Sequence, residues 1–571
     1  MLTFILSMLL TAGFQTGISV QDQQPPEQLS ATPASTTVSD GRREAQKGGS
    51  IQGKVIGADT AAGLRKTTLM LRRVDSQTGD KPSTTQTDQG GDYRFEDVKP
   101  GKYTLAASRN GYVRQVYGQK GADPFSPAGI TLDVKPGEAL ESINFRLIRG
   151  GAVEGRILDV DNEPLANVMV QLMVYRSFQG KRRLMPTGMA QTDDRGHYRI
   201  FNVPPGSYIL SSTYLSFEAP GGSSPFSPTY YPGVSTPQEA TKIQVSAARE
   251  LTGIDLILTE AVAYTISGKI VGSDGKPVIN GWVNPMRLPM TEMMFALGGD
   301  NSTDSQGNFK LTNVFPGKYR LVAMTNREGK QQTASTQVEV TNADVEGILI
   351  TMGEGAEIAG RLIVEEMVED LDIRRLRVSL VADPERGGLF MGWGTGGEVK
   401  DNLTFRLVNL SESEGRFQVT GLKETTFVKS IRVEGREVVD QTVEIKGSGR
   451  LEGVEIVISS EGASVRGVVR QEENGPVVKG ATVIAFPADI EKRFPNSRFI
   501  KTAQTDQQGG YSLRGFPPSE YLISALKKHE AGLESDENFL KELEKVAVKV
   551  KLNPGEDKTE SLIAVDPPEV E

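Results

Sequence analysis

The sequence predicts an all-β protein of five tandem antiparallel β-sandwich domains with about seven strands each. A motif recurs at domain-sized intervals, and the residues around it alternate between apolar and polar, which is the period of a half-buried strand. Glycine makes up 62 of 571 residues, roughly 11% against a usual ~7%, which is typical of a chain with many turns. A length prior of about 150 residues per domain gives roughly four domains and argues against one large core.

The recurrent motif reads Thr-Asp-x-x-Gly-x-aromatic and is followed by Pro-Gly or Pro-Ser, one residue and a Tyr. The interval from the Asp to this last Tyr is 15 residues in each of four copies. The copies start at Asp88, Asp193, Asp304 and Asp506 and end at Tyr103, Tyr208, Tyr319 and Tyr521. An Asp that opens a tight turn accepts bonds from backbone N–H groups, and Gly three residues later supplies a positive φ. The motif therefore predicts a hairpin, with the Tyr in the core.

A fifth, degenerate copy is assigned to Glu412, Gly415 and Phe417, with Phe427 at the place of the last Tyr. The five copies then start 105, 111, 108 and 94 residues apart, which is the length of a domain and not of a solenoid repeat. A Gly-led apolar strand precedes each copy, at Gly53, Gly155, Gly268, Gly360 and Gly467. These boundaries define repeats 1 to 5 as residues 49–149, 150–260, 261–353, 354–459 (degenerate) and 460–566.

The two ends of the chain differ from the repeats. Residues 2–14 are apolar and too short to span a bilayer, so residues 1–19 are predicted to be a secretory signal peptide, although no basic residue precedes Arg42. Either the signal is atypical or the true start lies upstream; the alternative to a signal is an apolar disordered terminus. Residues 20–48 are rich in Pro, Ser and Thr and predict a disordered linker, and residues 567–571 are an acidic tail. One short helix is predicted in the last repeat, at 535–545, with Ser535 as its N-cap.

Composition excludes several classes of function. The net charge is −9, which opposes nucleic-acid binding. The chain has no Cys and two His, so thiolate nucleophiles and cysteine zinc sites are excluded and His chemistry has little room. We therefore predict no enzyme activity, no catalytic residues, no metal and no cofactor. The repeated Asp are interpreted as turn caps, with calcium ligands as the alternative.

The pattern of Gly-led strand, D-x-x-G-x-Y and P-P-G-x-Y resembles the carboxypeptidase regulatory-like domain, over roughly residues 49–566. The resemblance is strong in repeats 1, 2, 3 and 5 and weak in repeat 4. It implies a non-catalytic seven-stranded sandwich of the immunoglobulin/transthyretin-like kind, grouped with Cna B-type and carbohydrate-binding-like sandwiches. Cna B-type relatives can carry an isopeptide bond, for which Lys54 and Asn144 are the best pair here; the alternative is an exposed strand Lys.

Aromatic residues in the long loops are the candidate ligand contacts. They are Tyr117, Phe125, Phe226, Tyr230, Tyr231 and Trp393. Loop aromatics can stack on sugar rings or fill a partner's pocket. The alternative is that they fold back over the end of their own sandwich.

These features predict an exported, non-enzymatic structural or adhesive array, located in the periplasm, on the cell surface or in the medium of a bacterium. The alternative is a carbohydrate-binding protein whose loop aromatics stack on glycans. The expected partners are a glycan or an envelope or surface protein, with no nucleic acid and no membrane span. The chain is expected to be monomeric.

Overall fold

The computed structural model describes residues 47–568, except 75–80, 120–128, 215–225, 289–300, 328–329, 354, 366–370, 383–395, 411 and 447–448. The proposed signal peptide, nearly all of the linker, Phe125 and Trp393 lie outside the described residues. The fold is all-β, with many sheets and one α-helix in the described part of the chain. None of the described helices is long and apolar enough to cross a membrane.

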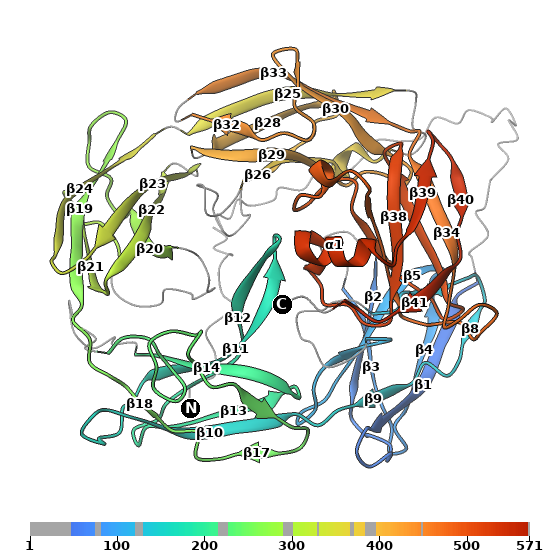
Figure 1. The fold of residues 1–571 in the computed structure, drawn as a ribbon, viewed down its shortest axis with the longest axis horizontal. Coiled ribbons are helices and arrows are strands. Elements are labelled where there is room, and N and C mark those ends of the chain that lie inside the picture. Colours follow the sequence, from blue (N-terminus) through green and yellow to red (C-terminus); the bar gives the residue numbers. More distant parts are fainter. Residues whose placement is uncertain are drawn as a thin grey trace, which may run out of the picture. The chain divides into compact units, whose positions relative to one another are not determined.

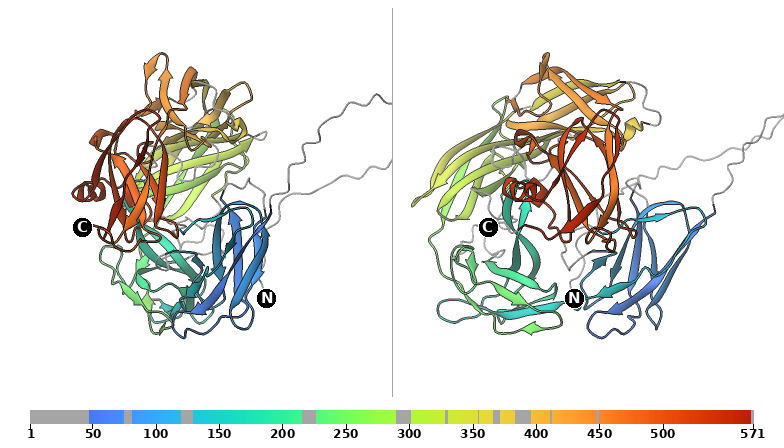
Figure 2. Two further views of the ribbon diagram at one scale, coloured as in Figure 1. Left: turned by 90° about the vertical axis from the view of Figure 1, so that its right-hand side faces the viewer. Right: turned by 45° about the vertical axis from the view of Figure 1, so that its right-hand side comes forward.

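Repeat 1 consists of two sheets (Figure 1, Figure 2). The first sheet contains β1 (Gly49–Gly57), β4 (Asp92–Val98), β8 (Ala139–Leu140) and β9 (Phe145–Leu147). The second contains β2 (Thr68–Arg73), β3 (Ser83–Gln86), β5 (Gly101–Ser108), β6 (Gln115–Val116) and β7 (Leu132–Val134). Side chains of both sheets share one buried cluster, as expected for a sandwich.

Repeats 2 and 3 follow the same plan. In repeat 2, β10 (Gly151–Leu158), β13 (His197–Val203), β17 (Glu250–Leu251) and β18 (Leu256–Ile257) form one sheet. The other sheet has β11 (Val168–Phe178), β12 (Lys181–Gln191), β14 (Gly206–Tyr214), β15 (Thr229–Tyr230) and β16 (Ile243–Val245). In repeat 3, β19 (Tyr264–Gly272), β21 (Asn308–Val314) and β24 (Val345–Met352) form one sheet, and β20 (Trp282–Leu288), β22 (Gly317–Arg327) and β23 (Lys330–Val340) the other.

Repeats 4 and 5 add further elements. In repeat 4, one sheet has β25 (Ala356–Glu365), β28 (Thr404–Leu410), β30 (Phe427–Val433), β31 (Arg436–Glu437) and β33 (Arg450–Ser459). The other has β26 (Arg377–Ala382), β27 (Gly396–Glu398), β29 (Ser413–Thr420) and β32 (Val443–Ile445), preceded by the 3₁₀ turn η1 (Ile373–Arg375).

In repeat 5, β41 (Leu562–Val565) pairs with both β34 (Ala463–Arg470) and β38 (Ser519–Leu526), so its sheets are continuous. The other elements are β35 (Thr482–Pro487), β36 (Lys501–Gln504), β37 (Gly510–Phe516), β39 (Val548–Leu552), β40 (Asp557–Thr559), η3 (Ile490–Lys492), η4 (Leu533–Ser535) and α1 (Glu537–Glu544). The N-cap of α1 is Asp536, whose carboxylate accepts from the Phe539 N–H at 3.0 Å. Ser535, the predicted cap, ends η4 instead.

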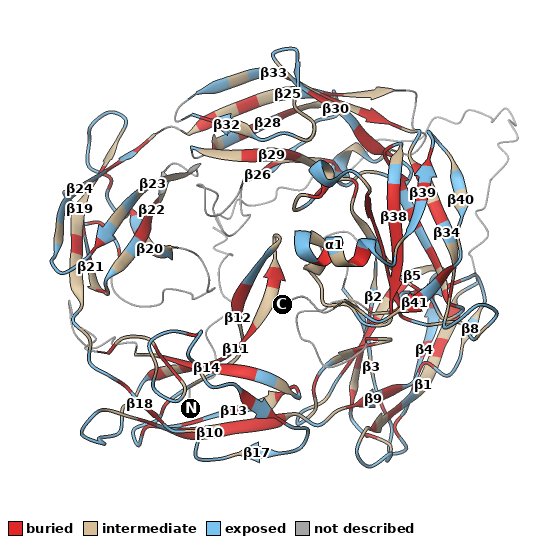
Figure 3. Ribbon diagram, viewed as in Figure 1, coloured by how far each residue is buried: buried red, intermediate tan, exposed pale blue. Residues whose placement is uncertain are grey.

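The cores are separate. Figure 3 shows buried residues concentrated along the strands. The five largest buried clusters each fall within one repeat, and no residue belongs to two of them. Two smaller clusters lie within repeats 2 and 5. This separation supports the division into five domains, which stays a prediction.

One prediction follows for the whole chain. We expect limited proteolysis to cut before residue 49 and in the long loops, and to release fragments of about 100 residues that match the repeats, because each repeat has its own core. Mass spectrometry of the time course identifies the cut sites. A single resistant core that covers all five repeats would contradict the prediction.

The recurrent strand Gly and the first aromatic residue of the motif form one structural unit. Its third member is a carbonyl that lies just before the last strand of the repeat. Gly53 in β1 pairs with Tyr93 in β4, and a Cβ at Gly53 would collide with the carbonyl of Ile143. The same carbonyl accepts the Tyr93 hydroxyl at 2.6 Å. Repeats 2 and 5 repeat the arrangement with Gly155, Tyr198 and the Ile254 carbonyl, and with Gly467, Tyr511 and the Glu560 carbonyl. The strand Gly is therefore required by close approach of the chain about 90 residues later.

Gly155→Ala tests this unit. The new methyl would overlap the Ile254 carbonyl, so β10 and the segment just before β18 must separate and the Tyr198 hydrogen bond must lengthen. We expect repeat 2 to lose about 2 kcal/mol of stability, in the range for overpacking. Hydrogen exchange of β10 and β13 in the full chain measures the loss. Gly396→Ala is the matched control, since a Cβ there makes only an ordinary contact at 3.9 Å.

The Tyr that ends each motif packs in the core, and its hydroxyl forms a hydrogen bond to a carbonyl earlier in the chain. Its hydroxyl donates to the carbonyl four residues earlier at 2.6–2.8 Å in repeats 1, 2, 3 and 5. The donors are Tyr103, Tyr208, Tyr319 and Tyr521. The sequence prediction that these rings are core residues is confirmed, since each is at most 8% exposed.

Repeat 4 corrects the assignment of the degenerate motif. Gly360 pairs with Phe405, as Gly53 pairs with Tyr93. Strand β28 therefore corresponds to β4, the strand that follows the turn of the motif. The turn before it starts at Lys400, whose N–H donates to Thr404 O, and Leu403 takes the positive φ of 62°. Glu412 lies in the following turn, so the predicted copy is twelve residues too late.

The cause of this error is local. Repeat 4 has lost both the Asp and the Gly of the turn, and the nearest match by spacing is Glu412 with Gly415. Gly415 in fact faces Val443 in β32, as Tyr103 faces Leu132 in β7. With the turn at residue 400 the copies are 105, 111, 96 and 106 residues apart.

The sheets are not purely antiparallel. The last strand of each repeat pairs parallel with the first, for example β24 with β19 and β33 with β25. This pairing brings the final strand back beside the first in the same direction. Each repeat is thus closed by its own ends.

Candidate functional site

Tyr230, the central residue of the predicted contact loop, is buried. Its backbone belongs to β15, which pairs with β14 through Ser211 and Ser212. The side chain is 3% exposed and belongs to a cluster with Met173, Leu184 and Ile209. The ring therefore presents almost no surface to a ligand, which opposes its predicted role as a ligand contact.

Phe226 is buried for a similar reason. It is 8% exposed and belongs to the main core of repeat 2, where its ring meets Tyr214 edge-on at 5.6 Å between centroids. Tyr231 is half-buried and packs against the same core. The alternative stated from the sequence, in which the loop folds back onto its own sandwich, describes these residues. The physical reason is that β15 adds to the edge of the sheet and carries the loop rings inward.

The remaining aromatic candidates divide into two groups. Tyr117 is half-buried, packs against the core of repeat 1 and meets Phe145 edge-on at 5.8 Å. Burial raises the pKa of its hydroxyl. Phe125 and Trp393 lie outside the described residues, so their role as ligand contacts stays a prediction. The four candidate rings in the described part of the chain do not form one surface, since Tyr117 packs in repeat 1 and the other three in repeat 2.

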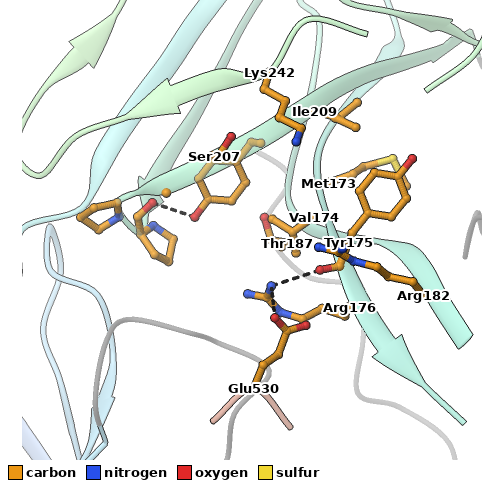
Figure 4. Close-up of a pocket in the computed structure, with 14 residues that line it drawn as sticks. Met173, Val174, Tyr175, Arg176, Arg182, Thr187, Ser207, Ile209, Lys242 and Glu530 are labelled. Atoms are coloured by element: carbon orange, nitrogen blue, oxygen red, sulfur yellow. Dashed lines mark hydrogen bonds and ion pairs between the residues drawn. The ribbon is translucent and has the colours of Figure 1, made fainter. Parts of the chain in front are cut away.

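The structure instead shows a basic surface that was not predicted. A cavity of about 350 Å³ lies beside β11 and β14 (Figure 4). Arg176, Arg182 and Lys242 line it, with Glu530 of repeat 5 as the carboxylate. Arg176 Nη1 is 3.7 Å from Glu530 Oε2, and the Arg182 guanidinium lies 5.8 Å from the centre of the Tyr175 ring. The available signal was the run Lys181-Arg182-Arg183 in a chain of net charge −9.

The repeated Asp residues cap turns, as interpreted from the sequence. Asp88 Oδ1 accepts from the N–H groups of Gly90 and Asp92, both at 2.8 Å. The same pair of bonds recurs at Asp193, Asp304 and Asp506. No group of three or more metal-binding side chains is found in the described ranges. One carboxylate oxygen of each Asp, Oδ1, accepts both backbone bonds, which confirms the turn interpretation.

These bonds predict a pH dependence. Backbone donation from His197 lowers the pKa of Asp193, and donation from Asn308 lowers the pKa of Asp304. A lowered folded-state pKa stabilises the turn above the unfolded pKa of about 3.9, and this contribution is lost as the pH falls through the folded pKa. We expect the 303–309 turn to lose hydrogen-exchange protection as the pH falls below about 4 and through the lowered pKa of Asp304, after correction for intrinsic rates. Asp304→Asn keeps an acceptor without titrating, so its protection should change less over the same range.

The family comparison agrees with the geometry of repeat 1. The model of the carboxypeptidase regulatory-like domain matches residues 50–147, which include the Gly53–Tyr93–Ile143 unit, the Asp88 turn and the Tyr103 ring. Residues 50–147 are thus similar to a carboxypeptidase regulatory-like domain. In this domain the rings of Tyr93 and Phe145 are packed together, with centroids 6.4 Å apart.

Other similarities are more distant. Colossin-A of Dictyostelium discoideum is 23% identical over 287 residues, which cover 47% of this chain and 2% of that protein. The minor pilin GBS52 of Streptococcus agalactiae has 15% identity and a TM-score of 0.21, with 37% of this chain and 96% of the pilin covered. The major pilin BcpA of Bacillus cereus has 11% identity and a TM-score of 0.14, with 53% and 99% covered. A putative carbohydrate binding protein from Pseudomonas aeruginosa has 15% identity and a TM-score of 0.11, with 15% and 87% covered.

Repeat 1 also contains the predicted isopeptide pair, Lys54 and Asn144. The Lys54 amine lies 3.3 Å from Asp92 Oδ2, and both side chains are about half exposed. Asn144 Oδ1 accepts from the backbone N–H of Lys54 at 2.8 Å. The Lys54 side chain thus forms a surface ion pair, while the Asn144 side chain holds the strand backbone. Lys54 is thus an exposed strand Lys, which was the alternative to an isopeptide bond.

Proposed function

We propose that this chain is a non-enzymatic structural or adhesive array that is exported and works outside the cytoplasm. One observation supports it above the others: the first and last strands of a repeat lie parallel and adjacent. In repeat 3 the pairing runs from Ile266–Val345 to Gly272–Met352, and in repeat 4 from Glu357–Arg450 to Glu365–Ser459.

This geometry resists tension along the chain. A pull on the N-terminal end of the first strand and the C-terminal end of the last slides two parallel strands past each other. The hydrogen bonds between them must then break together instead of one at a time. A tandem series of such sandwiches suits a spacer that holds or presents a binding surface under load.

The recurrent residues support the same proposal, because they are used to build the sandwich. The strand Gly permits close approach, the Asp caps the hairpin and the two aromatic rings fill the core. A chain without Cys and with two His has correspondingly little side-chain chemistry left for catalysis.

Single-molecule force spectroscopy of the full chain tests the proposal. We expect up to five unfolding peaks, each releasing about 350 Å, the length of roughly 100 extended residues. The peaks should be well resolved, because each requires shear of a parallel pair. Extension at low force without separate peaks would contradict a mechanical role.

Export and partners need their own measurement. The partners that we propose are envelope or surface proteins, with the chain itself monomeric. Fractionation of producing cells should place the chain outside the cytoplasm, and sedimentation of the purified chain should give the mass of one copy. Recovery only in the cytoplasmic fraction would exclude the exported array.

A further inference from the structure

Two elaborations distinguish repeats 2 and 5 from repeat 1. The hairpin strands β11 and β12 have 11 residues each, whereas the corresponding β2 and β3 have six and four. Repeat 5 inserts η4 and α1 between β38 and β39. We call residues 176–183 the hairpin tip and residues 527–547 the helical insertion. Repeat 1 forms its two sheets without either elaboration.

The two elaborations carry opposite charge. The hairpin tip contains four basic residues and no acidic residue: Arg176, Lys181, Arg182 and Arg183. Residues 530–537 of the helical insertion contain four acidic residues and no basic residue: Glu530, Glu534, Asp536 and Glu537. Such complementary charges steer surfaces together and fix their register.

The hairpin tip and the helical insertion are in contact. Arg176 and Glu530 form an ion pair at 3.7 Å, drawn in Figure 4, and both side chains are at most 30% exposed. Near this ion pair the backbones of the hairpin tip and the helical insertion approach each other closely at two places. A Cβ at Gly180 would lie 2.5 Å from the Ser535 carbonyl, and a Cβ at Gly532 would collide with the Ser177 carbonyl.

The helical insertion is held in shape before it meets the hairpin tip. Glu534 Oε2 contacts His529 Nε2 at 2.9 Å and accepts from the Gly532 N–H at 2.8 Å, which holds the turn that faces Ser177. Behind it, Phe539, Leu540 and Leu543 of α1 are fully buried in repeat 5. A preformed surface loses little conformational entropy when it docks.

We propose that the hairpin tip of repeat 2 and the helical insertion of repeat 5 form an intramolecular latch, in which each elaboration is the docking partner of the other. Residues more than 340 positions apart are joined by this contact. The latch makes repeats 2 and 5 one connected unit and limits their independent motion.

Distance measurements on the full chain test the latch. The chain has no Cys, so Met189→Cys and Asn538→Cys introduce two exposed dye positions, one in each repeat. Arg176→Glu and Glu530→Arg should each raise the ratio of open to closed molecules about fivefold, seen as a loss of energy transfer. The double variant restores opposite charges and should return transfer to within about twofold of the parent. Raising the salt concentration should reproduce part of the single-variant effect.

A pair of Gly→Ala substitutions provides a second test of the latch. Gly180 and Gly453 have the same φ of +71°, but a Cβ at Gly453 meets nothing within 4 Å. Gly180→Ala should therefore lower energy transfer, and Gly453→Ala should leave it unchanged. Hydrogen exchange of β11 in each variant shows that the hairpin itself stays folded. The latch is overturned if the parent shows low transfer, if the double charge variant stays open, or if Gly180→Ala behaves as Gly453→Ala does.

Discussion

Replacing Tyr319 by Ala is expected to unfold repeat 3 selectively, with a loss of about 3–4 kcal/mol. The ring is 8% exposed and packs with Leu321, Val283 and Ile350 in the core of that repeat. Its removal leaves a cavity between the two sheets and deletes the hydrogen bond to the Phe315 carbonyl, 2.8 Å long. Hydrogen exchange of residues 264–352 in the full chain reports the loss, since a multi-domain chain has no single unfolding transition.

Tyr319→Phe is the matched control. It keeps the ring and removes only the hydroxyl, so the expected loss is about 1 kcal/mol. Protection in repeats 1 and 5 should remain at the wild-type level in both variants, because their cores share no residue with repeat 3. An equal loss in all repeats would show that the five sandwiches unfold as one unit.

Replacing Tyr230 by Ser is expected to destabilise repeat 2 by about 3 kcal/mol without any effect on ligand binding. The ring fills the space between Met173, Leu184 and Ile209, and β15 is held to β14 through the residues around it. Hydrogen exchange of repeat 2 in the full chain and a glycan array on the same protein preparation separate the two roles. Specific sugar binding that disappears while the protection of repeat 2 is unchanged would reverse our assignment.

Tyr231→Ser is the comparison within the same loop. Tyr231 is half-buried, so its replacement should lower stability less than that of Tyr230. Its backbone N–H still donates to the Leu210 carbonyl at 3.0 Å in the variant, which keeps the loop attached. A larger loss at Tyr231 than at Tyr230 would place the core of this loop elsewhere.

The candidate site was the part of the protein least predictable from the sequence. Pro and aromatic residues at 225–232 suggest a stiff, exposed loop, but the same residues suit a strand that closes a sheet edge. Only the pairing of Ser211 with Tyr230 decides between the two. Whether a loop ring faces solvent or core depends on which sheet edge is vacant, and this information lies in other parts of the chain.

The sequence by itself determined the all-β class, the recurrent hairpin and the core phase of Tyr103, Tyr208, Tyr319 and Tyr521, because turn chemistry and strand alternation are local. Tertiary structure alone decided three features. The carbonyl of Ile143, 90 residues later in the chain, is the reason that Gly53 cannot carry a Cβ. The pairing of β25 with β28 shows that the turn of repeat 4 starts at Lys400. Parallel pairing joins the first and last strands of a repeat. In each case the deciding partner is distant in sequence, so no short window of residues contains it.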